Sequence, residues 1–235
     1  MLTFRGVLPQ LLRPELHAAR TLPLLWGALC SMLTSSVPLL AGAHPDTEAS
    51  AILLRACAVF SVIGIAFLLD DPAAISTAVT PVSRRVRHAV RLGAGLVIPA
   101  VAWASSAALV RAAMPDNRAL PVAALALEGV VLALLTVLLT LLGLRFTTGV
   151  TGSLLAAPAL VIALAVMLAL PAGTALFVSP TDADWHDAVV RWRILGAGTL
   201  VGCLWLLRSE PGSRMSRRTA TSAVPEATPR SRVRA

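Results

Sequence analysis

Six long apolar stretches constrain the fold of this chain more than any other feature of its sequence. Each is long enough to cross the hydrocarbon core of a bilayer, which is about 30 Å thick and needs roughly 20 helical residues. Charged residues make up only 14% of the 235 residues, against about 25% in soluble domains. The sequence therefore predicts an all-α polytopic membrane protein. We expect its six transmembrane helices at 21–43, 50–69, 92–113, 120–144, 153–178 and 188–207.

The placement of arginine predicts how these helices are oriented. The chain has 20 basic residues, and all of them are arginine. If both termini are cytoplasmic, 15 of the 20 fall on the cytoplasmic side: Arg5, Arg13, Arg20, Arg84, Arg85, Arg87, Arg91, Arg145, Arg208, Arg214, Arg217, Arg218, Arg230, Arg232 and Arg234. Membrane proteins favour that side for basic residues, so we expect cytoplasmic termini. The arginine, alanine and leucine bias suggests a GC-rich bacterial genome and hence a bacterial plasma membrane.

The chain divides into three parts around these spans. Residues 1–20 carry a short apolar side and predict an N-terminal amphipathic elbow. Residues 21–207 form the expected six-helix transmembrane domain. Residues 208–235 are rich in Ser, Thr, Pro and Arg without apolar periodicity, which predicts a basic disordered cytoplasmic tail close to anionic lipid headgroups.

The loop 71–91, between the second and third spans, has the pattern of a basic amphipathic helix. Pro81 can occupy the first turn of a helix. From there three valines recur every four residues and form an apolar stripe, while arginines cover the rest of the circumference: Val82, Val86 and Val90, with Arg84, Arg85, Arg87 and Arg91. Such a helix can lie on lipid headgroups or fit a groove of a cytoplasmic protein.

Sequence motifs for nucleotide binding and hydrolysis are absent from the chain. It contains no GxxxxGK[ST], HExxH or GxSxG motif, and its three cysteines lie in apolar runs without metal-ligand spacing. We therefore expect no catalytic, cofactor-binding or metal-binding residue. The net charge of +8 is explained by membrane orientation, so no nucleic-acid partner is expected.

Two ionisable residues, Arg55 and Glu128, lie inside predicted spans. A charge near the bilayer centre costs at least about 2.5 kcal/mol, so such residues usually face a protein interior or water. Two interpretations stay open. Glu128 belongs to a substrate pathway, or it forms a structural pair with Arg55 or stays protonated.

The fifth predicted span contains Pro171, which ends or kinks a helix. We expect a re-entrant turn at 172–178, followed by a short outer helix capped by Thr181 or Asp182. Trp185 and Trp192 flank that helix and are interpreted as interfacial anchors. In the sixth span, Gly198 and Gly202 form a GxxxG pattern, which predicts close helix packing.

These features together resemble ABC-2-type ABC transporter permeases. The shared features are the N-terminal elbow, six spans, a basic amphipathic loop between spans two and three, and a broken fifth span. The run LDDPA…TP…RR.R also resembles that of actinobacterial permease-like membrane proteins. In that family the helix of this loop contacts a separate ATPase, which implies a partner-coupling role for Val82, Arg84, Arg85, Val86, Arg87 and Val90. The short outer loops and the unusual Glu128 depart from the family pattern.

The resemblance implies that the chain is the membrane subunit of an ATP-driven exporter and is not itself an enzyme. ATP and magnesium would bind a separate ATPase subunit, and two permease copies, identical or different, would form a dimer. The alternative is a non-transporting membrane anchor or assembly factor that recruits a cytoplasmic partner through the same loop.

Overall fold

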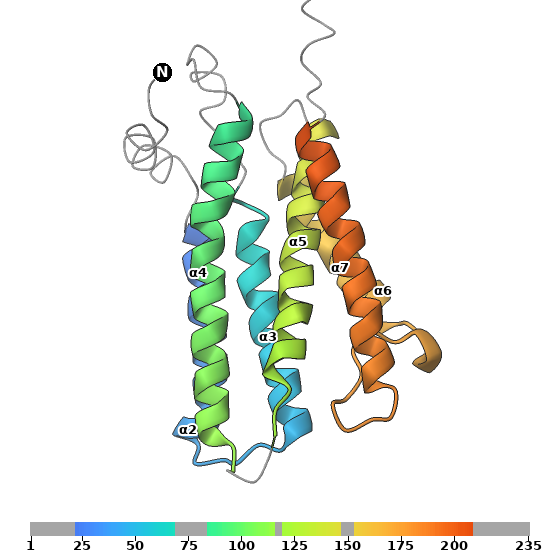
Figure 1. The fold of residues 1–235 in the computed structure, drawn as a ribbon. Coiled ribbons are helices and arrows are strands. Elements are labelled where there is room, and N and C mark those ends of the chain that lie inside the picture. The colour runs from blue at the N-terminus through green and yellow to red at the C-terminus, as the bar shows by residue number, and fades with distance from the viewer. Residues whose placement is uncertain (1–21, 69–83, 116–118, 147–152, 209–235) are drawn as a thin grey trace, which may run out of the picture.

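The computed structural model of the chain describes residues 22–68, 84–115, 119–146 and 153–208 (Figure 1). Within these ranges the protein is all-helical and contains no strand. The helices are α2 (Leu22–Leu40), α3 (Thr47–Ile65), α4 (Arg84–Ala113), α5 (Val122–Phe146), α6 (Ser153–Leu168) and α7 (Trp185–Arg208), with one 3-10 turn, η1 (Ala172–Thr174). The predicted N-terminal elbow and C-terminal tail lie outside the described residues.

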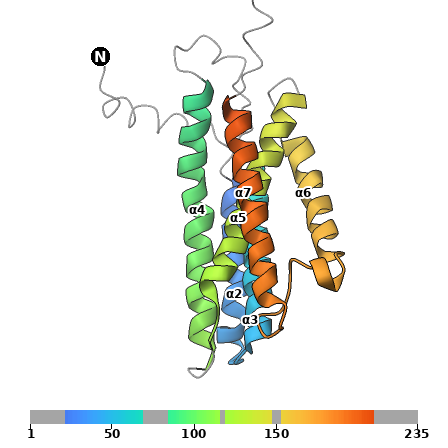
Figure 2. The same ribbon diagram turned by 45° about the vertical axis from the view of Figure 1, so that its right-hand side comes forward.

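Successive helices run in opposite directions and pack as two groups of three. α2 packs against α3 and α4, α5 packs against α6 and α7, and α3 joins the groups through α5 (Figures 1 and 2). Half of the apolar stretch of α3 is buried, against 22% to 33% in the other four long apolar helices. α3 is therefore the central helix of the described bundle.

Five of the six predicted spans are present as helices long and apolar enough to cross a membrane: α2, α3, α5, α7 and the part of α4 over Gly95–Ala113. The remaining helix, in the fifth predicted span at 153–178, is shorter than expected. α6 has 16 residues and so extends about 24 Å, less than the roughly 30 Å hydrocarbon core.

The segment after α6 also differs from its prediction. α6 ends at Leu168, three residues before Pro171, and η1 with an irregular loop then leads directly into α7. There is no separate short outer helix, because α7 runs unbroken from Trp185 to Arg208. Thr181 and Asp182 do not cap it. Its first backbone hydrogen bond runs from the Ala188 amide to the Asp184 carbonyl.

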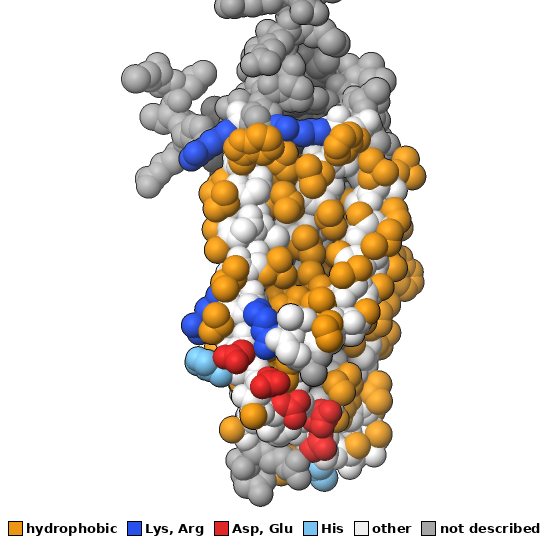
Figure 3. Space-filling view, turned by 90° about the vertical axis from the view of Figure 1, so that its right-hand side faces the viewer, with side chains coloured by type: hydrophobic (Ala, Val, Ile, Leu, Met, Phe, Trp, Pro, Cys, Tyr) orange, Lys and Arg blue, Asp and Glu red, His pale blue; other side chains and the backbone are white. Residues whose placement is uncertain are grey.

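The face of the bundle seen in Figure 3 is apolar between two polar ends. Large apolar side chains are more than half exposed on all six described helices: examples are Trp26, Ile52, Val101, Val130, Ile162 and Ile194. An exposed apolar surface of this extent is typical of contact with lipid. The protein is therefore membrane-embedded.

The two ends of the bundle differ in charge. One end, here called the acidic end, holds the α2–α3 turn and the α6–α7 loop and carries Asp46, Glu48, Asp182, Asp184 and Asp187. The opposite end, here called the basic end, holds the start of α4 and carries Arg145 and Arg208. Apart from the buried Glu128, every acidic side chain that the structure describes lies at the acidic end.

Two residues of the α2–α3 turn, Gly42 and Asp46, determine where α2 ends and α3 begins. Gly42 has a φ of 62°, and the Ala43 and Gly42 amides donate to the carbonyls of Pro38 and Leu39, which is the Schellman arrangement that ends a helix. Asp46 then caps α3 by accepting a hydrogen bond from the Ala49 amide at 2.7 Å. The short turn holds α2 and α3 antiparallel.

Two glycines let α2 and α3 approach closely. A Cβ added at Gly27 would collide with the Phe60 carbonyl oxygen, and one added at Gly64 would lie 2.7 Å from the Leu24 Cα. Beside this contact, the Ser31 and Ser106 hydroxyls are 3.1 Å apart and fully buried. Small residues with buried hydroxyls are a common means of packing helices in membranes.

We expect Gly64→Ala to destabilise the protein by about 1–3 kcal/mol, because its Cβ would push against backbone atoms that cannot rotate away. Gly198→Ala is the matched control, since no described atom lies within 4 Å of its added Cβ. That change should alter stability by less than about 0.5 kcal/mol. Thermal unfolding of both variants in detergent measures the difference, and equal midpoints would contradict the close α2–α3 contact.

Candidate functional site

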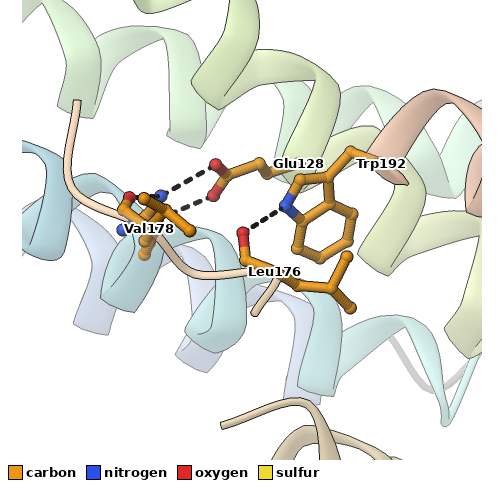
Figure 4. Close-up of polar contacts among 5 residues, drawn as sticks. Glu128, Leu176, Val178 and Trp192 are labelled. Atoms are coloured by element: carbon orange, nitrogen blue, oxygen red, sulfur yellow. Dashed lines mark hydrogen bonds and ion pairs between the residues drawn. The ribbon is translucent and has the colours of Figure 1, made fainter. Parts of the chain in front are cut away.

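The two ionisable residues inside the spans form a direct ion pair. Arg55 on α3 donates from Nε to Glu128 Oε2 at 2.7 Å and from Nη2 to Glu128 Oε1 at 2.9 Å (Figure 4). The side chains are 13% and 3% exposed, respectively. Two parallel hydrogen bonds between a guanidinium and a carboxylate make a strong, geometrically specific contact. This contact joins the two helix groups near the acidic end.

The loop between α6 and α7 completes the surroundings of Arg55. The Val178 carbonyl accepts a further hydrogen bond from Arg55 Nη2 at 2.7 Å. The guanidinium carbon also lies 5.5 Å from the ring centre of Phe177 and 5.8 Å from that of Trp185. Cations lying within about 6 Å of an aromatic face are attracted to it. Arg55 is thus held by a carboxylate, a carbonyl and two aromatic rings.

Trp192 holds this loop in place from α7. Its Nε1 donates to the Leu176 carbonyl at 2.9 Å (Figure 4), and its ring meets Phe177 edge-on with the centroids 5.4 Å apart. Trp192 is fully buried. A buried indole that is both packed and hydrogen-bonded fixes the backbone it contacts. The loop is therefore fastened over the ion pair.

This arrangement favours the structural interpretation of Glu128. Both of its carboxylate oxygens accept from Arg55, and the residue is only 2% exposed. A hydrophilic substrate would have to break these bonds to reach it. The chemistry of the cluster is that of a clamp between α3, α5 and the α6–α7 loop.

One of the two tryptophans of this region, Trp192, departs from its predicted role as an interfacial anchor. Trp192 does not lie at a lipid interface, because it is buried beneath the loop. Trp185 is half-buried and lies beside Arg55. The burial of Trp192 had one signal in the sequence. Trp192 is in helical register with other buried residues of α7, namely Ala188, Thr199 and Cys203.

The predicted coupling helix is described from Arg84 onward, and in that part it is not a separate element. The backbone is helical from Arg84 and continues without a break into the third span as α4. No proline interrupts residues 84–98, so the helical hydrogen bonds continue. Val82 lies outside the described residues, and so do the side chains of Arg84, Arg85, Val86, Arg87 and Val90.

Among the described residues, no backbone of a neighbouring helix lies close to the GxxxG pair of α7. The atoms nearest to a Cβ added at Gly202 belong to the Leu138 side chain, at 3.1 Å, and none of the described atoms lies within 4 Å of one at Gly198. Gly27 and Gly64 make the close backbone contact instead.

No group of three His, Cys, Asp or Glu side chains that could hold a metal ion occurs in the part of the chain that the structure describes. The chain matches no family model, no curated protein and no solved structure.

Proposed function

We propose that this chain is the membrane-spanning permease subunit of an ATP-driven, ABC-type exporter. One observation carries the proposal: a basic helical segment at the start of α4 continues without a break into its apolar stretch. α4 has 30 residues, and its part over Gly95–Ala113 is long and apolar enough to cross a membrane. The eight helical residues 84–91, which precede the predicted span at 92–113, extend roughly 12 Å further, and they contain Arg84, Arg85, Arg87 and Arg91.

A continuous helix gives this extension a mechanical consequence. A force applied at residues 84–91 would act directly on the transmembrane part of α4, because no loop or turn separates them. α4 in turn packs against α2 and the central helix α3. Movement of an attached ATPase would thereby tilt the helix group α2–α4 relative to the group α5–α7.

The partners follow from what the chain lacks and from its charge. It has no phosphate-binding motif, so ATP and magnesium would bind a separate ATPase subunit, and the chain itself would not be an enzyme. With the basic end in the cytoplasm of a bacterial cell, the orientation obeys the positive-inside rule. A second permease copy, identical or different, would complete a transporter with two ATPase subunits.

The proposal is tested by purifying the tagged chain from its native membrane in mild detergent. We expect a P-loop ATPase to copurify in a one-to-one molar ratio and the complex to hydrolyse ATP. Because ATP is cytoplasmic, cross-linking of this ATPase to residues 84–91 would also fix the orientation. Copurification of a partner without ATPase activity would contradict the exporter proposal.

A non-transporting membrane anchor is the second candidate. The buried ion pair between Arg55 and Glu128 favours it. Arg55 and Glu128 are bonded to each other, and the Val178 carbonyl takes a further Arg55 donor. A protein that only recruits a partner needs no polar passage through the bilayer. The copurification experiment separates the two candidates, because an anchor would bind a partner without ATP-dependent transport.

A further inference from the structure

A cavity lies between α3, α4 and α5, away from the ion pair. Its volume is about 280 Å³. Its walls include Ser61 and Ala58 on α3, Trp103 on α4, and Gly129 and Ala133 on α5. Ala100 and Val130, which also line it, are exposed on the lipid-facing surface, so the cavity opens toward the bilayer. Pockets for small molecules are typically of this size or larger, and mostly apolar.

Two buried polar atoms in this apolar wall have no partner. Neither Ser61 Oγ nor Trp103 Nε1 makes a hydrogen bond, and Ser61 is only 2% exposed. Other buried hydroxyls nearby are bonded: Thr136 and Thr140 donate to carbonyls of their own helix at 2.8 Å. Unpaired polar groups in an apolar environment are costly and rare. Two of them on one cavity indicate a missing hydrogen-bonding partner.

Gly129 lies beside the indole nitrogen on the α5 side of the cavity. A Cβ at this position would lie 3.8 Å from Trp103 Nε1 and 3.6 Å from the Ala58 Cβ. Because an indole N–H can only donate, its partner must be an acceptor. The rest of the wall is apolar, so a water molecule would find only these two groups, the lowest number of the two to four polar partners it needs.

The depth of Trp103 in the bilayer limits which molecules could place an acceptor beside its indole nitrogen. Trp103 lies ten residues before the end of α4 at Ala113, or about 15 Å along the helix, near the middle of a 30 Å hydrocarbon core. The polar atoms of an ordinary phospholipid lie at the headgroup level. The acceptor must therefore sit on a molecule whose oxygen reaches the interior of the bilayer.

We propose that this cavity binds an apolar, bilayer-dissolved molecule carrying a carbonyl oxygen, which accepts hydrogen bonds from Trp103 Nε1 and Ser61 Oγ. The inference does not depend on the exporter function, since a permease or an anchor could hold such a molecule. The cavity accommodates a small fused ring system, with any longer apolar chain extending between α4 and α5 into the lipid.

The test uses two probes that differ only in their carbonyl groups. Tritiated 2-methyl-1,4-naphthoquinone and 2-methylnaphthalene are bound to the full chain in lipid nanodiscs, and saturable binding is measured by scintillation proximity. We expect the quinone to bind saturably and at least fivefold more tightly than the hydrocarbon, because one net hydrogen bond corresponds to about a fivefold to tenfold change in affinity.

Four variants assign the binding to this cavity. Trp103→Phe and Ser61→Ala should each weaken quinone binding about fivefold, and Trp103→Phe should leave hydrocarbon binding unchanged. Ala133→Leu fills the cavity and should abolish saturable binding. Ala157→Leu, in a separate apolar groove between α3 and α6, should have no effect. Unfolding midpoints without ligand identify any variant that fails to fold.

Three outcomes would overturn the proposal. They are the absence of saturable quinone binding, equal affinity for the two probes, and undiminished binding by Trp103→Phe. A fourth outcome would show that a second copy of the chain, and not a small molecule, covers the cavity. If Val130→Cys forms a disulfide with a second copy of the chain in membranes, a protein contact covers the cavity and the lipid-soluble ligand is excluded.

Discussion

Replacing Arg55 by glutamine is expected to lower the stability of the protein by about 3–5 kcal/mol, the usual cost of removing one partner from a buried ion pair. Glu128 would then keep a carboxylate, only 3% exposed, without its two hydrogen-bond donors. The loop would also lose the bond to the Val178 carbonyl. The unfolding midpoint in detergent should fall by on the order of 10 °C.

Glu128→Gln should destabilise the protein to a comparable degree, because it leaves the guanidinium without a counter-charge. The double variant should recover part of the loss, so that the combined effect is at least about 1 kcal/mol smaller than the sum of the two. Arg193→Gln is the matched control: this arginine is exposed on α7, and its loss should change stability by less than about 0.5 kcal/mol. Additive effects of the Arg55 and Glu128 variants would show that the two side chains do not stabilise each other. That result would restore a substrate role for Glu128.

The long spans could be predicted because their signal is local. An apolar run of twenty residues determines a membrane helix almost regardless of its neighbours, and α2, α3, α5 and α7 follow the predicted ranges closely. The run at 153–178 is equally apolar, but Pro171 and Gly173 stop it from continuing as a helix. Composition alone could not show that the remaining residues would fold over the ion pair.

The surroundings of the ion pair were only half predictable. Two opposite charges within spans suggest a pair, and Arg55 and Glu128 are indeed bonded. The third partner, however, is the backbone carbonyl of Val178, and a carbonyl has no sequence signature. Likewise, Gly27 and Gly64 are 37 positions apart in the sequence, so no spacing rule reveals that they face each other across α2 and α3.

The extent of α4 shows a third limit of sequence patterns. The valine and arginine periodicity predicted a helix over 81–91, and the backbone is helical from Arg84. Periodicity does not show whether such a helix lies flat on the membrane or continues a span. That outcome depends on the residues that follow, where Gly93 and Gly95 weaken a helix but do not break it.

The largest functional effect is expected from Val86→Asp, which places a carboxylate on the predicted apolar stripe and keeps all four arginines. If residues 84–91 only mark the cytoplasmic side, their total charge matters and this change is silent. If they bind an ATPase, the stripe must fit a groove where desolvated apolar anchors dominate the binding energy. A charge placed in such a contact should reduce coupled activity more than tenfold.

Two further variants make this experiment specific. Scrambling residues 84–91 at constant composition should insert normally but abolish coupling as Val86→Asp does. Ala112→Asp introduces the same carboxylate at the exposed acidic end of α4, and it should leave coupling intact. Membrane insertion of each variant is verified before activity is compared.

The most direct measurement is ATP hydrolysis by the chain and its copurified ATPase, reconstituted together in liposomes. The exporter account predicts wild-type activity for Ala112→Asp and a more than tenfold loss for Val86→Asp and for the scrambled helix, with all variants correctly inserted. Wild-type activity in all three variants would show that residues 84–91 serve only as a charged boundary of the membrane span, and it would contradict the proposed coupling.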